Sequence, residues 1–190
     1  MAMEALFVSA AVVAIAEIGD KTQLLALMLA ARYRKPVPII LGILLATLAN
    51  HALAAWLGEA VANWVGTETM RWILGVSFIV MAGWCLIPDK AGDGPQAARH
   101  SGAFLATLVA FFIVEIGDKT QIATVALAAR FNSLVAVTAG TTVGMLLANV
   151  PVVLFGDAIA KHLPLKWVRA TAAALFVALG LAALLMPFGR

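Results

Sequence analysis

A polar motif that occurs twice inside long apolar segments constrains this chain more than any other feature. Glu-Ile-Gly-Asp-Lys-Thr-Gln occupies residues 17–23 and again residues 115–121, 98 positions later. When residues 17–32 are compared with residues 115–130, 11 of 16 are identical. Ionisable groups are expensive at the centre of a bilayer, and where they occur they usually serve a function. The two copies are therefore candidates for parts of one functional site.

The composition favours a bilayer as the solvent of this chain. Of its 190 residues, 63% are hydrophobic and 12% are charged, and the mean hydropathy is +1.00. Soluble domains carry about 25% charged residues. The net charge of +3 is spread over the ends of apolar segments, which does not indicate a nucleic-acid partner. The single cysteine, Cys85, excludes a disulfide framework within the chain. A cleavable signal peptide has basic residues before its apolar stretch, and here no Lys or Arg precedes the first one, so we do not expect such a peptide.

Six apolar segments predict an all-α integral membrane protein with six transmembrane helices. Most of them reach the length of about 17–25 residues that crosses the hydrocarbon core as a helix. The first and fourth are longer than a span needs, so we expect each either to tilt strongly or to break near Gly19 or Gly117. The predicted segments are Ala5–Ala31, Val37–Val61, Trp72–Ile87, Ala103–Ala129, Leu134–Ala160 and Trp167–Phe188.

A polar linker at residues 88–102 divides the chain into two halves, residues 1–87 and 103–190. Each half has three predicted helices, an odd number, so the second half enters the membrane from the opposite side. This is an inverted repeat, an architecture of many secondary transporters. The basic residues place the linker and the other odd-numbered loops in the cytoplasm and both termini outside. Eight lie on the cytoplasmic side (Arg32, Arg34, Lys35, Lys90, Arg99, Lys161, Lys166, Arg169) and three on the other (Arg71, Arg130, Arg190).

The inverted arrangement brings the two motifs toward one point in the middle of the membrane. Each ionised group there costs about 2.5–3.5 kcal/mol on insertion scales, so the groups must face each other, water or a bound ion. Four carboxylates and two lysines, all ionised, carry a net charge of −2, which one divalent cation would balance. Carboxylate and amide oxygens suit Ca²⁺, Mn²⁺ and Mg²⁺. The motifs contain no Cys or His, which argues against a site built for Zn²⁺ or Cu⁺.

Two interpretations of these charges compete. In the structural one, Glu17 pairs with Lys21 and Glu115 with Lys119, four residues apart on a helix, and the pairs only hold the bundle together. Two lysines cannot neutralise four carboxylates, however. In the functional interpretation, the carboxylates cannot all ionise when no metal is bound, because like charges and burial both favour the protonated form. Protons and a divalent cation then compete for the same oxygens, which is the physical basis of antiport.

The doubled Glu-x-Gly-Asp-Lys-Thr motif resembles the signature of the Gdt family of small six-helix cation/proton exchangers. That family includes Golgi Ca²⁺/Mn²⁺ transporters of eukaryotes and bacterial manganese exporters of the MneA type. The resemblance covers nearly the whole chain. It implies a multi-pass protein of the bacterial inner membrane that exports Mn²⁺, or Ca²⁺, from the cytoplasm in exchange for protons, without a resident cofactor. Carried onto this sequence, the acidic residues that hold the cation and the protons are Glu17, Asp20, Glu115 and Asp118, and we expect Gln23 and Gln121 to help coordinate the metal.

Several other polar residues are candidates for accessory roles at this site. Position 51 aligns with position 149, and both are polar. His51 could line the ion path, but the interpretation we favour is a hydrogen bond to a neighbouring helix. Small residues aligned at Gly42 and Gly140 indicate close helix packing. The accessory candidates are Lys21, Thr22, Lys119, Thr120, Asn50, His51 and Asn149.

Two alternatives to the exchanger differ from it in mechanism. A passive divalent-cation channel is the first, although two polar motifs meeting at one depth favour an occluded site over a continuous pore. A membrane enzyme is the second, and it is disfavoured because the sequence offers no nucleophile–base pair and no phosphate-binding loop. Glu59 and Asp157, which align with each other, could attract cations at the two mouths of the path or could simply end helices at the interface. Six helices are few to seal a cavity, so a homodimer is a further hypothesis.

Overall fold

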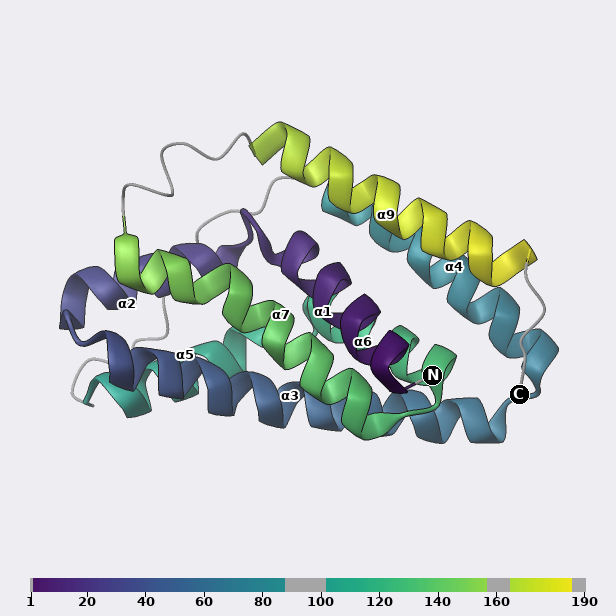
Figure 1. Ribbon diagram of the computed structural model, residues 1–190, viewed down its shortest axis with the longest axis horizontal. Helices are drawn as coiled ribbons and strands as arrows, with labels where there is room; N and C mark the ends of the chain where they lie inside the picture. The colour runs from purple at the N-terminus through teal and green to yellow at the C-terminus, as the bar shows by residue number, and fades with distance from the viewer. Residues whose placement is uncertain (1, 88–101, 157–164, 186–190) are drawn as a thin grey trace.

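The computed structural model describes residues 2–87, 102–156 and 165–185, and this part of the chain is entirely helical apart from its connections (Figure 1). The predicted all-α class is confirmed for these residues. The 88–101 part of the predicted linker and the predicted ends of the last two segments, at Ala160 and Phe188, lie outside them. The helices are α1 (Ala2–Glu17), α2 (Lys21–Tyr33), α3 (Pro36–Trp64), α4 (Thr67–Cys85), α5 (Ala103–Glu115), α6 (Lys119–Phe131), α7 (Leu134–Phe155) and α9 (Leu165–Leu185).

The first and fourth apolar segments are each broken at the motif. The axes of α1 and α2 differ in direction by 73°. Gly19 and Gly117 lie in the breaks with φ values of 80° and 76°, in the left-handed region that glycine adopts at little cost. Of the two predicted alternatives, a break near these glycines is therefore the one the structure adopts, and a single tilted helix is excluded.

By length and composition, α3 and α7 could each cross a membrane alone, and the bent pair α1–α2 could form a third span. Among the described helices, α5 and residues 169–185 of α9 are shorter apolar helices. Figure 1 shows that α1 and α7 begin and α3 ends toward the right of the view, whereas α2 ends and α3 begins at the left. This alternation is compatible with the predicted topology. Six spans and outside termini stay predictions.

The two halves of the chain are interleaved. The broken helix of each half packs along the unbroken helix of the other half: α1 along α7, and α5 along α3. Glycines allow these close approaches, because a Cβ atom at Gly144 would lie 2.6 Å from the Ala10 carbonyl oxygen, and one at Gly42 would lie 2.7 Å from the Thr107 Cβ. The small-residue positions therefore serve packing, as predicted.

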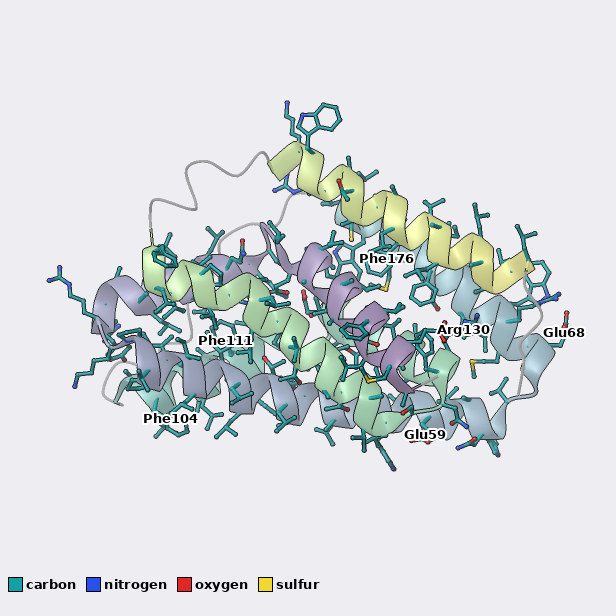
Figure 2. All side chains as sticks on the ribbon, viewed as in Figure 1. Glu59, Glu68, Phe104, Phe111, Arg130 and Phe176 are labelled. Carbon is teal, nitrogen blue, oxygen red and sulfur yellow. The ribbon has the colours of Figure 1, made fainter. Side chains whose placement is uncertain are left out.

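Helices α4 and α9 form a pair beside these helices. Phe176 of α9 lies in the space between them (Figure 2) and stacks on Phe78 of α4, with ring centroids 6.1 Å apart. α4 begins at Thr67, earlier than the predicted Trp72, because its first turn contains polar residues that an apolar pattern does not include. In that turn Arg71 and Glu68 form an ion pair at 2.6 Å.

Candidate metal site

The two motif glutamates lie at the C-terminal ends of α1 and α5, and both are fully buried. In each carboxylate one oxygen accepts a hydrogen bond and the other has no partner. Asn149 Nδ2 donates to Glu17 Oε1 at 3.2 Å, and Thr120 Oγ1 donates to Glu115 Oε2 at 3.0 Å. Glu17 Oε2 and Glu115 Oε1 are buried without a hydrogen-bond donor. Because an unpaired buried carboxylate oxygen is costly, these two atoms are suited to hold a proton or a cation.

The motif aspartates begin the second half of each broken segment, and each pairs with the lysine of the opposite copy. Lys21 Nζ lies 2.7 Å from Asp118 Oδ1, and Lys119 Nζ lies 3.0 Å from Asp20 Oδ2. Asp20 also caps α2, since its Oδ1 accepts a hydrogen bond from the Lys21 backbone N–H at 2.6 Å. The breaks remove the continuous-helix spacing that would set each lysine beside the glutamate of its own copy. The ion pairs thus join the two repeats.

Three carboxylates from both copies converge closely enough to hold one cation. One oxygen each from Glu17, Glu115 and Asp118 lies within 4.8 Å of the others, and all three residues are buried. Oxygens that bind one ion at about 2.3–2.6 Å lie no more than roughly 5 Å apart. With Asp20 and Asp118 facing Lys119 and Lys21, the two glutamates hold the negative charge that the lysines leave uncompensated.

The helix ends add to the potential at this place. At the C-terminal ends of α1 and α5 the helix dipole carries a partial negative charge, which favours a cation beside the glutamates. The N-terminal ends of α2 and α6 carry the opposite partial charge, and there the structure places Asp20 and Asp118. Broken helices whose ends meet at an ion are a recurring device of secondary transporters.

The motif glutamines form hydrogen bonds across the two breaks. Gln23 Oε1 accepts a hydrogen bond from the Gly19 backbone N–H at 2.8 Å, and Gln121 Oε1 accepts one from the Gly117 N–H at 2.7 Å. Gln23 Nε2 also donates to the Ala148 carbonyl oxygen of α7 at 2.8 Å. Sequence reasoning missed this role, although a side-chain amide four residues after a helix-breaking glycine is a signal for it. Metal ligation by the glutamines stays a prediction.

The accessory candidates divide into those that touch the glutamates and those that do not. Asn149 and Thr120 donate to them, as described above. Asn50 instead bonds a neighbouring helix, since its Nδ2 donates to the Phe112 carbonyl oxygen at 3.0 Å. Thr22 is buried, and its hydroxyl has no hydrogen-bond partner.

The hydrogen bond that we predicted between His51 and a neighbouring helix is not present in the structure. The His51 imidazole is fully buried, and neither ring nitrogen makes the predicted hydrogen bond to a neighbouring helix. Instead, Nε2 lies 3.9 Å from Glu115 Oε2. The reason is the close packing of α3 along α5, which sets this position of α3 beside the end of α5.

Of the two carboxylates proposed at the mouths of the path, the structure describes only Glu59. Glu59 is half-buried in the second half of α3, and Figure 2 shows it at the end of the molecule that also carries Arg130 and Glu68. Asp157 lies outside the described residues. A role for either in attracting cations stays a prediction.

Replacing Gly117 by alanine is expected to destabilise the protein by about 1–2 kcal/mol through the backbone alone, because φ is 76° there and no atom lies within 4 Å of the added Cβ. Gly83→Ala is the matched control: it also adds a Cβ to open space, but within α4, where alanine is favoured by about 0.5–1 kcal/mol. Thermal unfolding of the two variants in detergent should therefore shift the midpoint in opposite directions. Equal midpoints would show that the break does not depend on the left-handed glycine.

Comparison with known proteins identifies relatives over nearly the whole chain. The family model described as "Divalent cation/proton antiporter GDT1" matches residues 5–93 and 103–189, one match for each half. A Vibrio cholerae protein named "Putative manganese exporter" is 57% identical over 181 residues, which cover 95% of this chain and 90% of the relative. Rice (Oryza sativa) proteins named "GDT1-like protein 3" are 25% identical over 210 residues, covering 97% of this chain and 75% of the relatives. No solved structure matches.

Proposed function

From the premise that this chain belongs to the GDT1 family of divalent cation/proton antiporters, we propose that it exports Mn²⁺ from the cytoplasm in exchange for protons. The family is one of membrane transporters and not of enzymes. The observation that carries the proposal is the buried group formed by Glu17, Glu115 and Asp118, which draws on both copies of the motif. Manganese as the cargo, and its export, are supported by the name of the Vibrio cholerae relative.

The geometry divides the charged residues into two kinds. Asp20 and Asp118 each face a lysine, which balances their charge. Glu17 and Glu115 each have one buried oxygen without a donor, so each can take up a proton when the cation leaves. Two protons for one divalent cation leave the charge of the site unchanged, which makes the proposed exchange electroneutral. The competition for the same oxygens couples the two fluxes.

Transport through proteoliposomes tests this proposal directly. We expect vesicles with an acidic interior to accumulate Mn²⁺ above its external concentration as protons leave, and an imposed membrane potential to have no effect on that accumulation. Ca²⁺ measured side by side ranks the two ions. Flux that equilibrates without accumulating, and that responds to the potential, would instead establish the passive channel. We also propose that the chain crosses a bacterial inner membrane six times. Whether it forms the predicted homodimer is tested by cross-linking in the same vesicles.

Mn²⁺ binding is expected to weaken as the pH falls. Protonation of Glu17 and Glu115 removes the charge that holds the cation, so each bound cation releases up to two protons. Where both glutamates are protonated in the empty protein, the affinity should fall by up to about a hundredfold for each unit of decreasing pH. Isothermal titration of the purified protein with MnCl₂ at a series of pH values measures this slope. An affinity that does not change with pH would contradict proton coupling at the site.

A further inference from the structure

The residue at the candidate site that the proposed exchange does not use is His51. It is fully buried in α3, and neither Nδ1 nor Nε2 has a hydrogen-bond partner. Buried polar groups in proteins are nearly always satisfied, so an unsatisfied one at a site points to a ligand that completes it. A charged group close to it is Glu115, whose Oε2 lies 3.9 Å from His51 Nε2.

The internal repeat supplies a comparison for this position. His51 and Asn149 are 98 residues apart, as the two motif copies are, and they occupy equivalent places in α3 and α7. Each lies beside the glutamate of the opposite copy, since Asn149 Nδ2 donates to Glu17 Oε1 at 3.2 Å. The two motif copies are identical from glutamate to glutamine. The imidazole is therefore one chemical difference between the surroundings of the two glutamates.

Resting on the proposed function, we propose that His51 supplies a ring nitrogen to the transported cation beside Glu115 and thereby selects Mn²⁺ against Ca²⁺. Nitrogen and oxygen ligands that bind one cation at about 2.0–2.6 Å lie at most roughly 5 Å apart. The distance of 3.9 Å between His51 Nε2 and Glu115 Oε2 satisfies that limit.

The chemistry of the ligands gives this nitrogen its effect on selectivity. Ca²⁺ takes six to eight oxygen ligands, and Mg²⁺ keeps several of its waters. First-row transition ions accept imidazole nitrogen more readily than these hard cations do. One imidazole among carboxylates therefore keeps the site oxygen-rich for Mn²⁺ and disfavours Ca²⁺. The same nitrogen should make Fe²⁺ and Zn²⁺ effective competitors.

Pulsed electron paramagnetic resonance of bound Mn²⁺ detects a coordinated nitrogen without any transport measurement. The full chain, purified through a tag that contains no histidine, is loaded with MnCl₂ after ¹⁵N labelling of its histidines alone. The chain has three histidines, so the unlabelled protein and the His51→Asn variant assign the signal to position 51. We expect the wild type to show the coupling of a directly bound ¹⁵N nucleus, and His51→Asn to lack it.

The substitution His51→Asn places at position 51 the residue that the other repeat has at position 149, so it is a conservative change for this fold. We expect it to weaken Mn²⁺ binding by at least about tenfold, as loss of a metal-supporting group does, and to change Ca²⁺ binding by less than about threefold. Asn149→His, the reciprocal variant, should retain the preference for Mn²⁺.

Three results would overturn the inference. Bound Mn²⁺ without histidine nitrogen coupling in the wild type would refute ligation, even if His51→Asn failed to fold. An equal loss of Mn²⁺ and Ca²⁺ affinity in the variant would show that His51 only positions Glu115. Absence of any Mn²⁺ binding to the wild type would overturn the proposed function, and this inference with it.

Discussion

Glu17→Gln is expected to abolish Mn²⁺/H⁺ exchange, lowering the initial flux into proteoliposomes by more than about a hundredfold. The substitution keeps the size of the side chain and its hydrogen bond from Asn149, but it removes the charge and the site of protonation. A glutamine at position 17 can neither pair with the buried cation nor carry a proton, so both cation binding and proton coupling should be lost. The measurement is the gradient-driven accumulation of Mn²⁺ described above.

The matched control for this variant is Glu68→Gln. Glu68 is also a glutamate in a helix, but its side chain is 72% exposed and it pairs with Arg71 away from the site. Its variant should transport at the wild-type rate. The protein must also remain folded, which size-exclusion chromatography of Glu17→Gln checks. A folded Glu17→Gln protein that accumulates Mn²⁺ normally would contradict the proposed mechanism.

Lys119→Met is expected to lower the free energy of unfolding by about 3–5 kcal/mol, because it removes the lysine that forms an ion pair with the buried Asp20 carboxylate. The side chains of this pair are 5% and 0% exposed. In a protein of this size, such a loss lowers the unfolding midpoint by roughly 6–20 °C. Thermal unfolding in detergent, followed by circular dichroism, measures it.

The double variant Lys119→Met with Asp20→Asn tests the cause. Removing the second charge should restore more than half of the lost stability, since no uncompensated ion then remains. Lys21→Met provides a comparison, because its side chain is 31% exposed and the pair with Asp118 is therefore less deeply buried, so its midpoint should fall by less than half as much. Equal losses for the two lysine variants would show that the buried pair has no special role.

The sequence was sufficient for the parts of this structure that depend on pattern. The apolar segments predict the helices, and the excess length of two of them, with a glycine in each motif, predicts the breaks that the structure shows. The partners across the repeats could not be predicted in the same way. The spacing on a continuous helix predicts that Lys21 lies beside Glu17. In the structure the chain turns at Gly19, and Lys21 pairs with Asp118 instead. Likewise, only the packing of α3 on α5 sets His51 beside Glu115.

The interleaved packing of the two halves has a consequence for how the protein is made. Asp20 finds its lysine 99 residues later in the chain, at Lys119. At a synthesis rate of about 5–20 residues per second, the ribosome needs roughly 5–20 s to reach it. During that interval the newly inserted first half holds its acidic motif without the partners that neutralise it and without α7, the helix along which α1 packs. The charged site can therefore assemble only after α5 and α6 of the second half have been made.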